Sequence, residues 1–230
     1  MKSALIFSAG RGERLYPITR HRPKALCLVQ GIPLIEHHII KLKQAGIEQL
    51  FINHAYLGDQ IKRHLGNGAR FGLEITYLPE PPGGLETGGT LVGLAPHLKQ
   101  TPVITINADI YTDYDFSKLK APAPTLAGHL ILVPQSDIHH SADFGLSTEG
   151  LLSLENRHFI FSGIAIYHPQ WFAKEKFRRF SLSPLLRDWA QHQKISGEIY
   201  HGTWVDIGTP ARLQYLQQVL VTAPHTTTSD

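Results

Sequence analysis

The sequence predicts an α/β fold in which a mixed, mostly parallel central sheet lies between layers of helices. Up to residue 107, four apolar stretches typical of strands alternate with three stretches of helical periodicity. The connections between them are short, which is typical of right-handed β-α-β units in a three-layer, Rossmann-like architecture. Beyond residue 107 the predicted strands follow one another without crossover helices, which favours antiparallel or mixed pairing in that half.

The elements of the first half can be placed from periodicity and from their stop signals. Strands are expected at residues 3–8, 48–54, 73–79 and 101–107, and helices at residues 33–46, 57–66 and 87–98. In the first helix Ile35, Ile39 and Leu42 share one face, and Gly46 ends the helix. Thr87 is the expected N-cap of the third helix.

The second half contains more strands than helices. Strands are expected at residues 124–134, 143–147 and 159–169, a pair of strands within 195–208, and helices at 182–193 and 210–220. Thr209 is the expected N-cap of the last helix, and Pro210 suits its first turn. No linker or repeat interrupts the chain, so we expect one domain over residues 1–221 and a flexible tail over residues 222–230.

The composition is that of an ordinary globular protein, with 42% hydrophobic and 18% charged residues. Cys27 is the only cysteine, which excludes a disulfide scaffold and favours a reducing compartment. The chain has no apolar run of roughly 18 residues and no signal-peptide pattern, so we expect a cytoplasmic protein with no membrane partner. A net charge of +3 and the absence of a recognition-helix pattern predict no nucleic-acid partner.

A loop rich in glycine and arginine, FSAGRGERLYPITRHRPKALCLV at residues 7–29, follows the first strand. Ligands of open α/β sheets bind at the carboxyl ends of the strands, where this loop begins. Its glycines let backbone N–H groups approach phosphate oxygens, and its guanidinium groups supply charge-assisted hydrogen bonds. The loop therefore indicates a phosphate site, although a solvated basic loop has the same composition.

The spacing of this loop excludes two familiar phosphate-binding motifs. A dinucleotide fingerprint needs glycine at position 15, which is Leu15. A Walker A loop needs lysine directly after its last glycine, and the lysine arrives only at Lys24. Pro17 and Pro23 make a helix improbable across residues 16–23, so we expect an irregular loop that brings Lys24 back toward a ligand.

The run AGRGERLYPIT, with PKAL downstream, closely resembles the signature G-x-G-x-R-L-x-P-L-T…P-K of the sugar-1-phosphate nucleotidyltransferases. Five further stretches are similar in order and spacing to the bacterial members that act on N-acetylmuramate α-1-phosphate. They are INHAYLGDQIKRHLGNGARFGLEITYLPE, LETGG, DIYTDYDF, FSGIAIYHP and SGEIYHGTWVDIGT. The resemblance covers residues 2 to about 215. Two positions depart from it. Ser8 stands where alanine or glycine is usual, and Ala108 stands where glycine is usual before the acid.

The resemblance implies a nucleotidyltransferase fold of the GT-A-like type, and it also implies the reaction that the protein catalyses. UTP and N-acetylmuramate α-1-phosphate would give UDP-N-acetylmuramate and pyrophosphate, in peptidoglycan recycling. It also implies a Mg²⁺ cofactor held by Asp109 and Asp206, with Arg11 and Lys24 as catalytic residues beside Asp109. From the residues alone, Asp109 could instead cap a turn and Asp206 could cap the last helix, while Asp115 is expected to cap a helix.

By the same resemblance, the nucleotide is expected on the half of the chain up to about residue 110 and the sugar on residues 111–221. The expected nucleotide-binding residues are Ala9, Gly10, Arg11, Gly12, Arg14, Lys24, Glu80, Gly84 and Gly88. The expected sugar-binding residues are Glu86, Asn107, Asp143, Ser162 and Gly163.

Three other functions remain open at this point. The same chemistry could act on another pair of substrates, such as mannose 1-phosphate and GTP. A nucleotide-binding regulatory subunit could keep the fold without the reaction, although the presence of Arg11, Lys24, Asp109 and Asp206 favours an enzyme. A nucleic-acid binder is the third alternative. The sequence does not indicate an oligomeric state.

Overall fold

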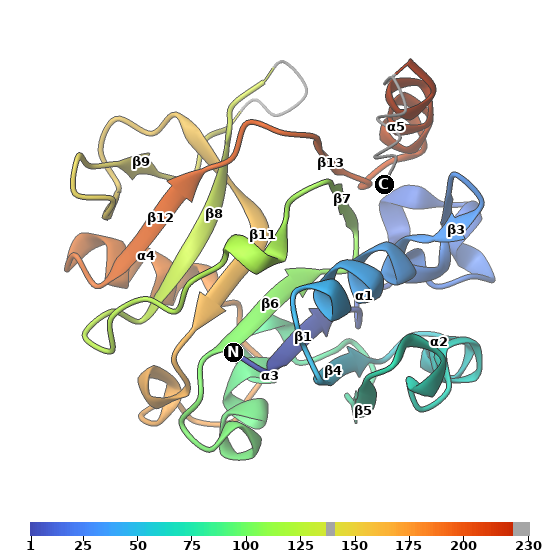
Figure 1. Ribbon diagram of the computed structural model, residues 1–230, viewed down its shortest axis with the longest axis horizontal. Helices are drawn as coiled ribbons and strands as arrows, with labels where there is room; N and C mark the ends of the chain where they lie inside the picture. Colours follow the sequence, from blue (N-terminus) through green and yellow to red (C-terminus); the bar gives the residue numbers. More distant parts are fainter. Residues whose placement is uncertain (137–140, 223–230) are drawn as a thin grey trace, which may run out of the picture.

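The computed structural model describes residues 1–136 and 141–222, and residues 223–230 of the expected tail lie outside this description. A seven-stranded sheet with the order β12-β8-β11-β6-β1-β4-β5 runs through the whole molecule (Figure 1). Its strands are β1 (Ser3–Phe7), β4 (Gln49–His54), β5 (Glu74–Pro79), β6 (Val103–Asn107), β8 (Gly128–Pro134), β11 (Phe159–Tyr167) and β12 (Ile195–Ile199). The two predicted halves therefore share one sheet.

The pairing in this sheet is mixed and mostly parallel, as the sequence predicts. β1 runs parallel to β4 and β6, β4 parallel to β5, and β12 parallel to β8. Only β11 is antiparallel to its two neighbours, β6 and β8. Within the described residues no α-helix lies between β8 and β11, and β11 returns antiparallel beside β8 because parallel neighbours need such a crossover.

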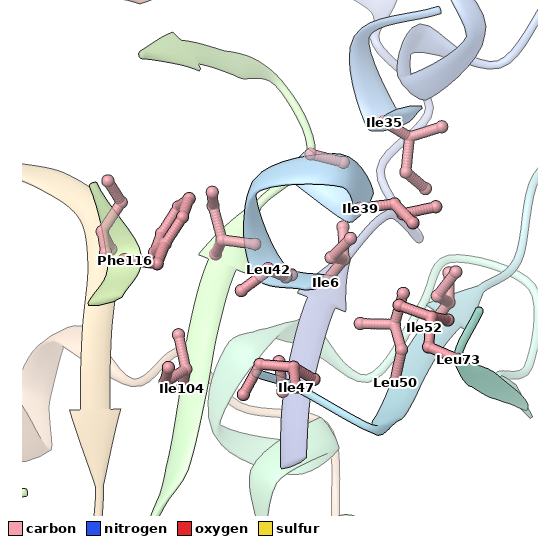
Figure 2. Close-up of a cluster of buried hydrophobic side chains, with 14 of the residues drawn as sticks. Ile6, Ile35, Ile39, Leu42, Ile47, Leu50, Ile52, Leu73, Ile104 and Phe116 are labelled. Atoms are coloured by element: carbon pink, nitrogen blue, oxygen red, sulfur yellow. The ribbon is translucent and has the colours of Figure 1, made fainter. Parts of the chain in front are cut away.

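Helices cover both faces of the sheet. On one face, α1 (Leu34–Gln44) and α2 (Gly58–Leu65) bury an apolar cluster against β1, β4 and β6. Ile35, Ile39 and Leu42 are fully buried there, which confirms the predicted face of α1, and Figure 2 shows them around Ile6 of β1. On the other face, α3 (Glu86–Leu94) and α4 (Ser183–Gln191) pack on a second cluster. None of the helices in the described residues is long and apolar enough to cross a membrane.

Several very short strands lie outside the main sheet. β2 (Leu28–Val29) pairs with β3 (Ile32–Pro33), and β9 (Gly145–Leu146) pairs with β10 (Leu152–Ser153). β7 (Ile110–Thr112) pairs with β13 (Trp204–Asp206). The strands predicted within 195–208 therefore belong to two sheets, because β12 joins the main sheet while β13 pairs with β7. The last helix, α5 (Pro210–Thr222), covers a small cluster that includes Val29 and Val205.

The helix caps only partly follow the sequence prediction. The backbone N–H of Arg212 donates to the Thr209 hydroxyl at 3.4 Å, and that of Ser117 donates to Asp115 at 3.0 Å, so both predicted caps are confirmed. Thr87 is not the N-cap of α3, since the helix already begins at Glu86. Its hydroxyl instead accepts from the Leu182 N–H at 3.1 Å and ties α3 to the start of α4.

Candidate active site

A cavity of about 730 Å³ opens at the carboxyl ends of β1, β4 and β6. The loop that follows β1 forms one wall, the segment that joins β5 to α3 forms another, and Asn107 to Asp109 at the end of β6 form the floor. This is the edge of an open α/β sheet at which ligands are expected. Segments that are far apart in the sequence meet there, so the cavity is the first place to look for the predicted site residues.

The loop after β1 is irregular, and hydrogen bonds to its own carbonyl groups hold it together. Short 3-10 turns occupy Glu13–Leu15, Ile18–Arg20 and Lys24–Leu26. The Thr19 hydroxyl donates to the Gly12 carbonyl at 2.7 Å, and Gly12 has a φ of 66°, a left-handed conformation that glycine adopts without strain. The returning chain brings Lys24 into the cavity wall, close to Gly12.

All the loop residues predicted to bind the nucleotide line the cavity. They are Ala9, Gly10, Arg11, Gly12, Arg14 and Lys24. The Arg11 guanidinium lies 5.2 Å from the centre of the Tyr56 ring and 3.4 Å from the Glu13 carboxylate. Arg11 and Arg14 are both exposed residues of the cavity lining.

The two acids that were predicted to hold a metal lie on neighbouring strands. Asp109 immediately precedes β7, Asp206 ends β13, and the Ile207 N–H donates to the Asp109 carbonyl at 2.8 Å. Lys24 Nζ donates to Asp109 Oδ2 at 2.7 Å, and the Arg212 guanidinium donates to Asp206 Oδ2 at 2.6 Å. Each carboxylate thus has one oxygen paired with a cation.

The second oxygen of Asp206 has no such partner. Asp206 Oδ1 is buried without a hydrogen bond, an arrangement that costs free energy unless a ligand completes it. Asp206 itself lines neither the cavity nor the smaller space beside it, but Gly208, which does line the cavity, lies so close that a Cβ built on it would be 2.8 Å from this oxygen. No group of three or more His, Cys, Asp or Glu side chains suited to a metal ion occurs within residues 1–136 and 141–222. Two carboxylates nevertheless suit Mg²⁺, which usually takes one or two from the protein and the rest of its ligands from phosphates and water.

The loop between β5 and α3 holds Glu80 and Gly84 at the cavity and places Gly88 elsewhere. Gly84 has a φ of 73° and lies against both Glu80 and Ala9. Gly88 lines no described cavity, because its N–H donates to the Phe180 carbonyl at 3.1 Å and the Phe180 ring fills the space where a Cβ would stand. This glycine lets α3 and the segment around Phe180 approach each other.

The residues predicted to bind the sugar are split between several places. Glu86 and Asn107 line the main cavity, and Gly163 lines an adjoining space of about 170 Å³ that also includes Asn107. Asp143 and Ser162 line neither space. The Asp143 carboxylate accepts from the Phe161 N–H at 2.9 Å, and the Ser162 hydroxyl accepts from the Ile164 N–H at 3.2 Å, so both serve the backbone around the bulge in β11.

The cavity contains residues that the sequence did not single out. Arg179 and Ser181 reach it from the segment before α4, and Arg179 Nε donates to Glu86 Oε1 at 3.1 Å. Their segment has no periodicity or motif that would have indicated a site. Asn53, the residue before the last of β4, also lines the cavity; its place near the carboxyl end of a predicted strand was the available signal.

Comparisons with known proteins were made on the whole chain. The sequence model of the nucleotidyl transferase family matches residues 3–220. An N-acetylmuramate alpha-1-phosphate uridylyltransferase of Neisseria meningitidis serogroup B is 40% identical over 222 residues, which cover 93% of this chain and 96% of that protein. A protein of the same name from Caulobacter vibrioides is 30% identical, over 91% of this chain and 93% of that protein. Among solved structures, a putative glucose-1-phosphate thymidylyltransferase from Bacillus anthracis superposes with a TM-score of 0.81 at 22% identity, covering 97% and 96% of the two chains, and so shares the fold.

Proposed function

Because this chain belongs to the nucleotidyl transferase family, we propose that it transfers the uridylyl group of UTP to N-acetylmuramate α-1-phosphate. The products are UDP-N-acetylmuramate and pyrophosphate, and the reaction serves peptidoglycan recycling in the cytoplasm. The near full-length similarity to the Neisseria meningitidis uridylyltransferase supports this choice of substrates. The Lys24–Asp109 ion pair, which joins the loop after β1 to the end of β6, is the observation that carries the reaction class.

The reaction brings two anions together, so the chain must supply positive charge. A phosphate oxygen of the sugar 1-phosphate attacks the α-phosphorus of UTP, and the bond from that phosphorus to the departing pyrophosphate breaks. The attacking oxygen is already ionised at neutral pH, so positioning and charge neutralisation provide the catalysis and no general base is needed. Arg11, Arg14 and Lys24 hold the triphosphate and stabilise the charge that accumulates on the pyrophosphate.

Asp109 and Asp206 would hold Mg²⁺ between them, with Asp206 Oδ1 as the oxygen that lacks a partner. When bound there, the ion would act as a Lewis acid and neutralise negative charge on the phosphates. Lys24 and Arg212 each pair with one oxygen of these acids, and they keep the two carboxylates oriented before substrates arrive.

In the proposed reaction, different parts of the cavity bind the triphosphate, the base and the sugar. The triphosphate lies along Ala9–Arg14, and the base lies against the glycine-containing loop near Gly84. The sugar lies toward Glu86, Asn107 and Gly163, where the main cavity meets the smaller space. This arrangement puts the sugar phosphate beside Asp109, at the end of β6.

The test is a panel of substrates scored by pyrophosphate release in the presence of Mg²⁺. With UTP fixed, we expect release with N-acetylmuramate α-1-phosphate ahead of the 1-phosphates of glucose, N-acetylglucosamine and mannose. With that sugar fixed, we expect UTP ahead of CTP, GTP and ATP. A preference for GTP with mannose 1-phosphate would replace the substrates and keep the chemistry, whereas no release with any pair would indicate a nucleotide-binding protein without this reaction.

A further inference from the structure

Glu80, at the start of the loop between β5 and α3, has a carboxylate that is almost fully engaged by the protein itself. The Leu85 N–H donates to Oε2 at 2.7 Å. The Asn53 side-chain amide donates to Oε1 at 2.8 Å, and the Thr90 hydroxyl donates to the same oxygen at 2.5 Å. A carboxylate offers roughly four acceptor sites, so three of them are filled before any ligand binds.

Asn53 extends this network to the opposite wall of the cavity. Its side chain is 3% exposed, and its Oδ1 accepts from the backbone N–H of Ser8 at 2.8 Å. The Ser8 hydroxyl in turn donates to the Asn53 carbonyl at 2.6 Å. Ser8 begins the loop that follows β1. A continuous set of hydrogen bonds therefore runs from that loop, through Asn53, to Glu80 and Leu85.

We propose that Glu80 is a positioning residue that does not read the base: together with Asn53 it locks the loop between β5 and α3 to the loop after β1. The inference rests on the proposed nucleotide site. Leu85 is held by the carboxylate, and Gly84 folds over the same group, with a φ of 73° and a Cβ position 3.3 Å from Oε2. The base is then recognised by backbone groups of the loop, in a conformation that Glu80 maintains.

The network requires a carboxylate and does not accept its amide. In Glu80→Gln, one terminal atom becomes an NH₂ group that faces either the Leu85 N–H or the side-chain amide of Asn53. The Thr90 hydroxyl can adapt, because it can turn its hydrogen to the Glu86 carbonyl at 2.8 Å, but these two donors cannot. Two donors then face each other, and a buried donor loses its partner. The loop should become less ordered and bind every nucleotide less tightly.

A base-reading role makes a different prediction for the same substitution. Uracil presents an N3–H donor that a carboxylate can accept, whereas cytosine presents an N3 acceptor at that position. If Glu80 contacted this edge, the new amide NH₂ of Glu80→Gln could donate to cytosine, and the preference would move from UTP toward CTP. The ratio of the two affinities therefore separates the two roles.

The experiment compares the dissociation constants of UTP, CTP and GTP, measured by titration calorimetry with Mg²⁺, in the wild type, Glu80→Gln, Thr90→Val and the double variant. We expect Glu80→Gln to weaken binding by about tenfold for each nucleotide, with the UTP-to-CTP ratio and the KM for the sugar phosphate unchanged. Thr90→Val should weaken nucleotide binding less than Glu80→Gln does. The double variant should weaken it by less than the product of the two single fold-changes, because both changes affect one carboxylate. Glu74→Gln, at the exposed first position of the preceding strand β5, is the matched control and should bind normally.

Two results would overturn the inference: a selective gain for CTP, or unchanged binding of all three nucleotides by Glu80→Gln. A general loss of folding is recognised separately, because it would lower the unfolding midpoint and the fraction of protein that binds nucleotide; in that case Thr90→Val, which keeps the carboxylate, decides. If the wild type prefers a nucleotide other than UTP, the proposed substrate fails, but the ratio of variant to wild type still tests the role of Glu80.

Discussion

Asp109 and Asp206 are the residues on which the proposed reaction depends most directly. The Lys24 side chain is only 11% exposed while its partner Asp109 is 39% exposed, and both residues line the cavity. Asp206 is paired on one side by Arg212 and unpaired at Oδ1. Both acids thus keep acceptor capacity that a cation can use.

Replacing either acid by its amide removes a negative charge and leaves the size of the side chain nearly unchanged. We expect Asp109→Asn and Asp206→Asn each to lower turnover by roughly 10²–10³-fold, a typical loss for removal of one electrostatic contact in an active site. Pyrophosphate release measured over a Mg²⁺ titration checks this, and a chelator such as EDTA should abolish activity of the wild type until Mg²⁺ is restored. Asp188→Asn, an exposed acid of α4 paired with His192, is the control. Full turnover of both amide variants would show that the metal assignment is wrong.

His38 makes the stability of the fold depend on pH. It is 1% exposed within α1, and burial, followed by the charge of His37, lowers its pKa from 6.5 to about 3. Below pH 6.5 the unfolded chain binds a proton that the folded protein does not, so stability is lost as the pH falls toward 3. At pH 5 the loss from this group is about 2 kcal/mol relative to pH 7.5.

Urea unfolding at pH 7.5, 6 and 5 measures this effect. We expect His38→Leu to flatten the decline of the unfolding free energy, leaving a smaller slope from groups such as His54, whose pKa burial also lowers. His201→Gln, at an exposed position, should keep the wild-type slope. Equal slopes in all three proteins would show that His38 does not remain neutral in the folded state.

At the scale of elements, the pairing of β7 with β13 assembles the site. These strands have three residues each, and they bring together acids that precede β7 and end β13. The bulge in β11 plays a similar part on the sugar side: the register shifts between Phe161 and Ile164, and Gly163, with a φ of 84°, lies against the Asn107 side chain. A pair of very short strands and a bulge in the long strand β11 therefore position several polar groups in and beside the cavity.

Gly163→Ala tests the role of this bulge. A Cβ at this position would lie 2.6 Å from Asn107 Nδ2, so the amide must move in addition to the strain of a left-handed alanine. Gly46→Ala is the matched control, because Gly46 has a φ of 82° and no atom within 4 Å of its Cβ position. We expect Gly163→Ala to be less stable than the control by about 1 kcal/mol and to raise the KM for the sugar phosphate with little change in the KM for UTP. Identical stability and KM values in the two variants would show that Asn107 does not contribute to the sugar site.

For the whole molecule, the sequence predicts the central sheet well because long apolar strands and amphipathic helices carry strong periodic signals. The buried face of α1 and the cap at Thr209 follow directly from such signals. The two- and three-residue strands β2, β3, β7 and β13 are too short for a periodicity to be detected, and β7 and β13 also lie far apart in the sequence.

The residues that line the cavity were predicted better in some segments than in others. The loop after β1 carries a motif in which glycines, arginines and lysine have fixed spacing, and all of its predicted residues line the cavity. Gly88, Asp143, Ser162 and Asp206 lie outside both described spaces, because similarity to a motif identifies a segment but not which of its side chains face a ligand. Arg179 enters the cavity from a segment with no recognisable pattern, and only the tertiary fold brings it to Glu86.

The proposed synthesis of UDP-N-acetylmuramate uses one cavity, with Lys24 and Asp109 in its lining and Asp206 beside the lining residue Gly208. Its most direct test is a competition in one vessel: UTP, Mg²⁺ and equal concentrations of the 1-phosphates of N-acetylmuramate, N-acetylglucosamine, glucose and mannose, with the nucleotide sugars identified by mass spectrometry. The account predicts UDP-N-acetylmuramate as the main product from the wild type and a fall of roughly 10²-fold or more in that product with Asp109→Asn. Another nucleotide sugar as the main product, or product formation that is unaffected by Asp109→Asn, would contradict it.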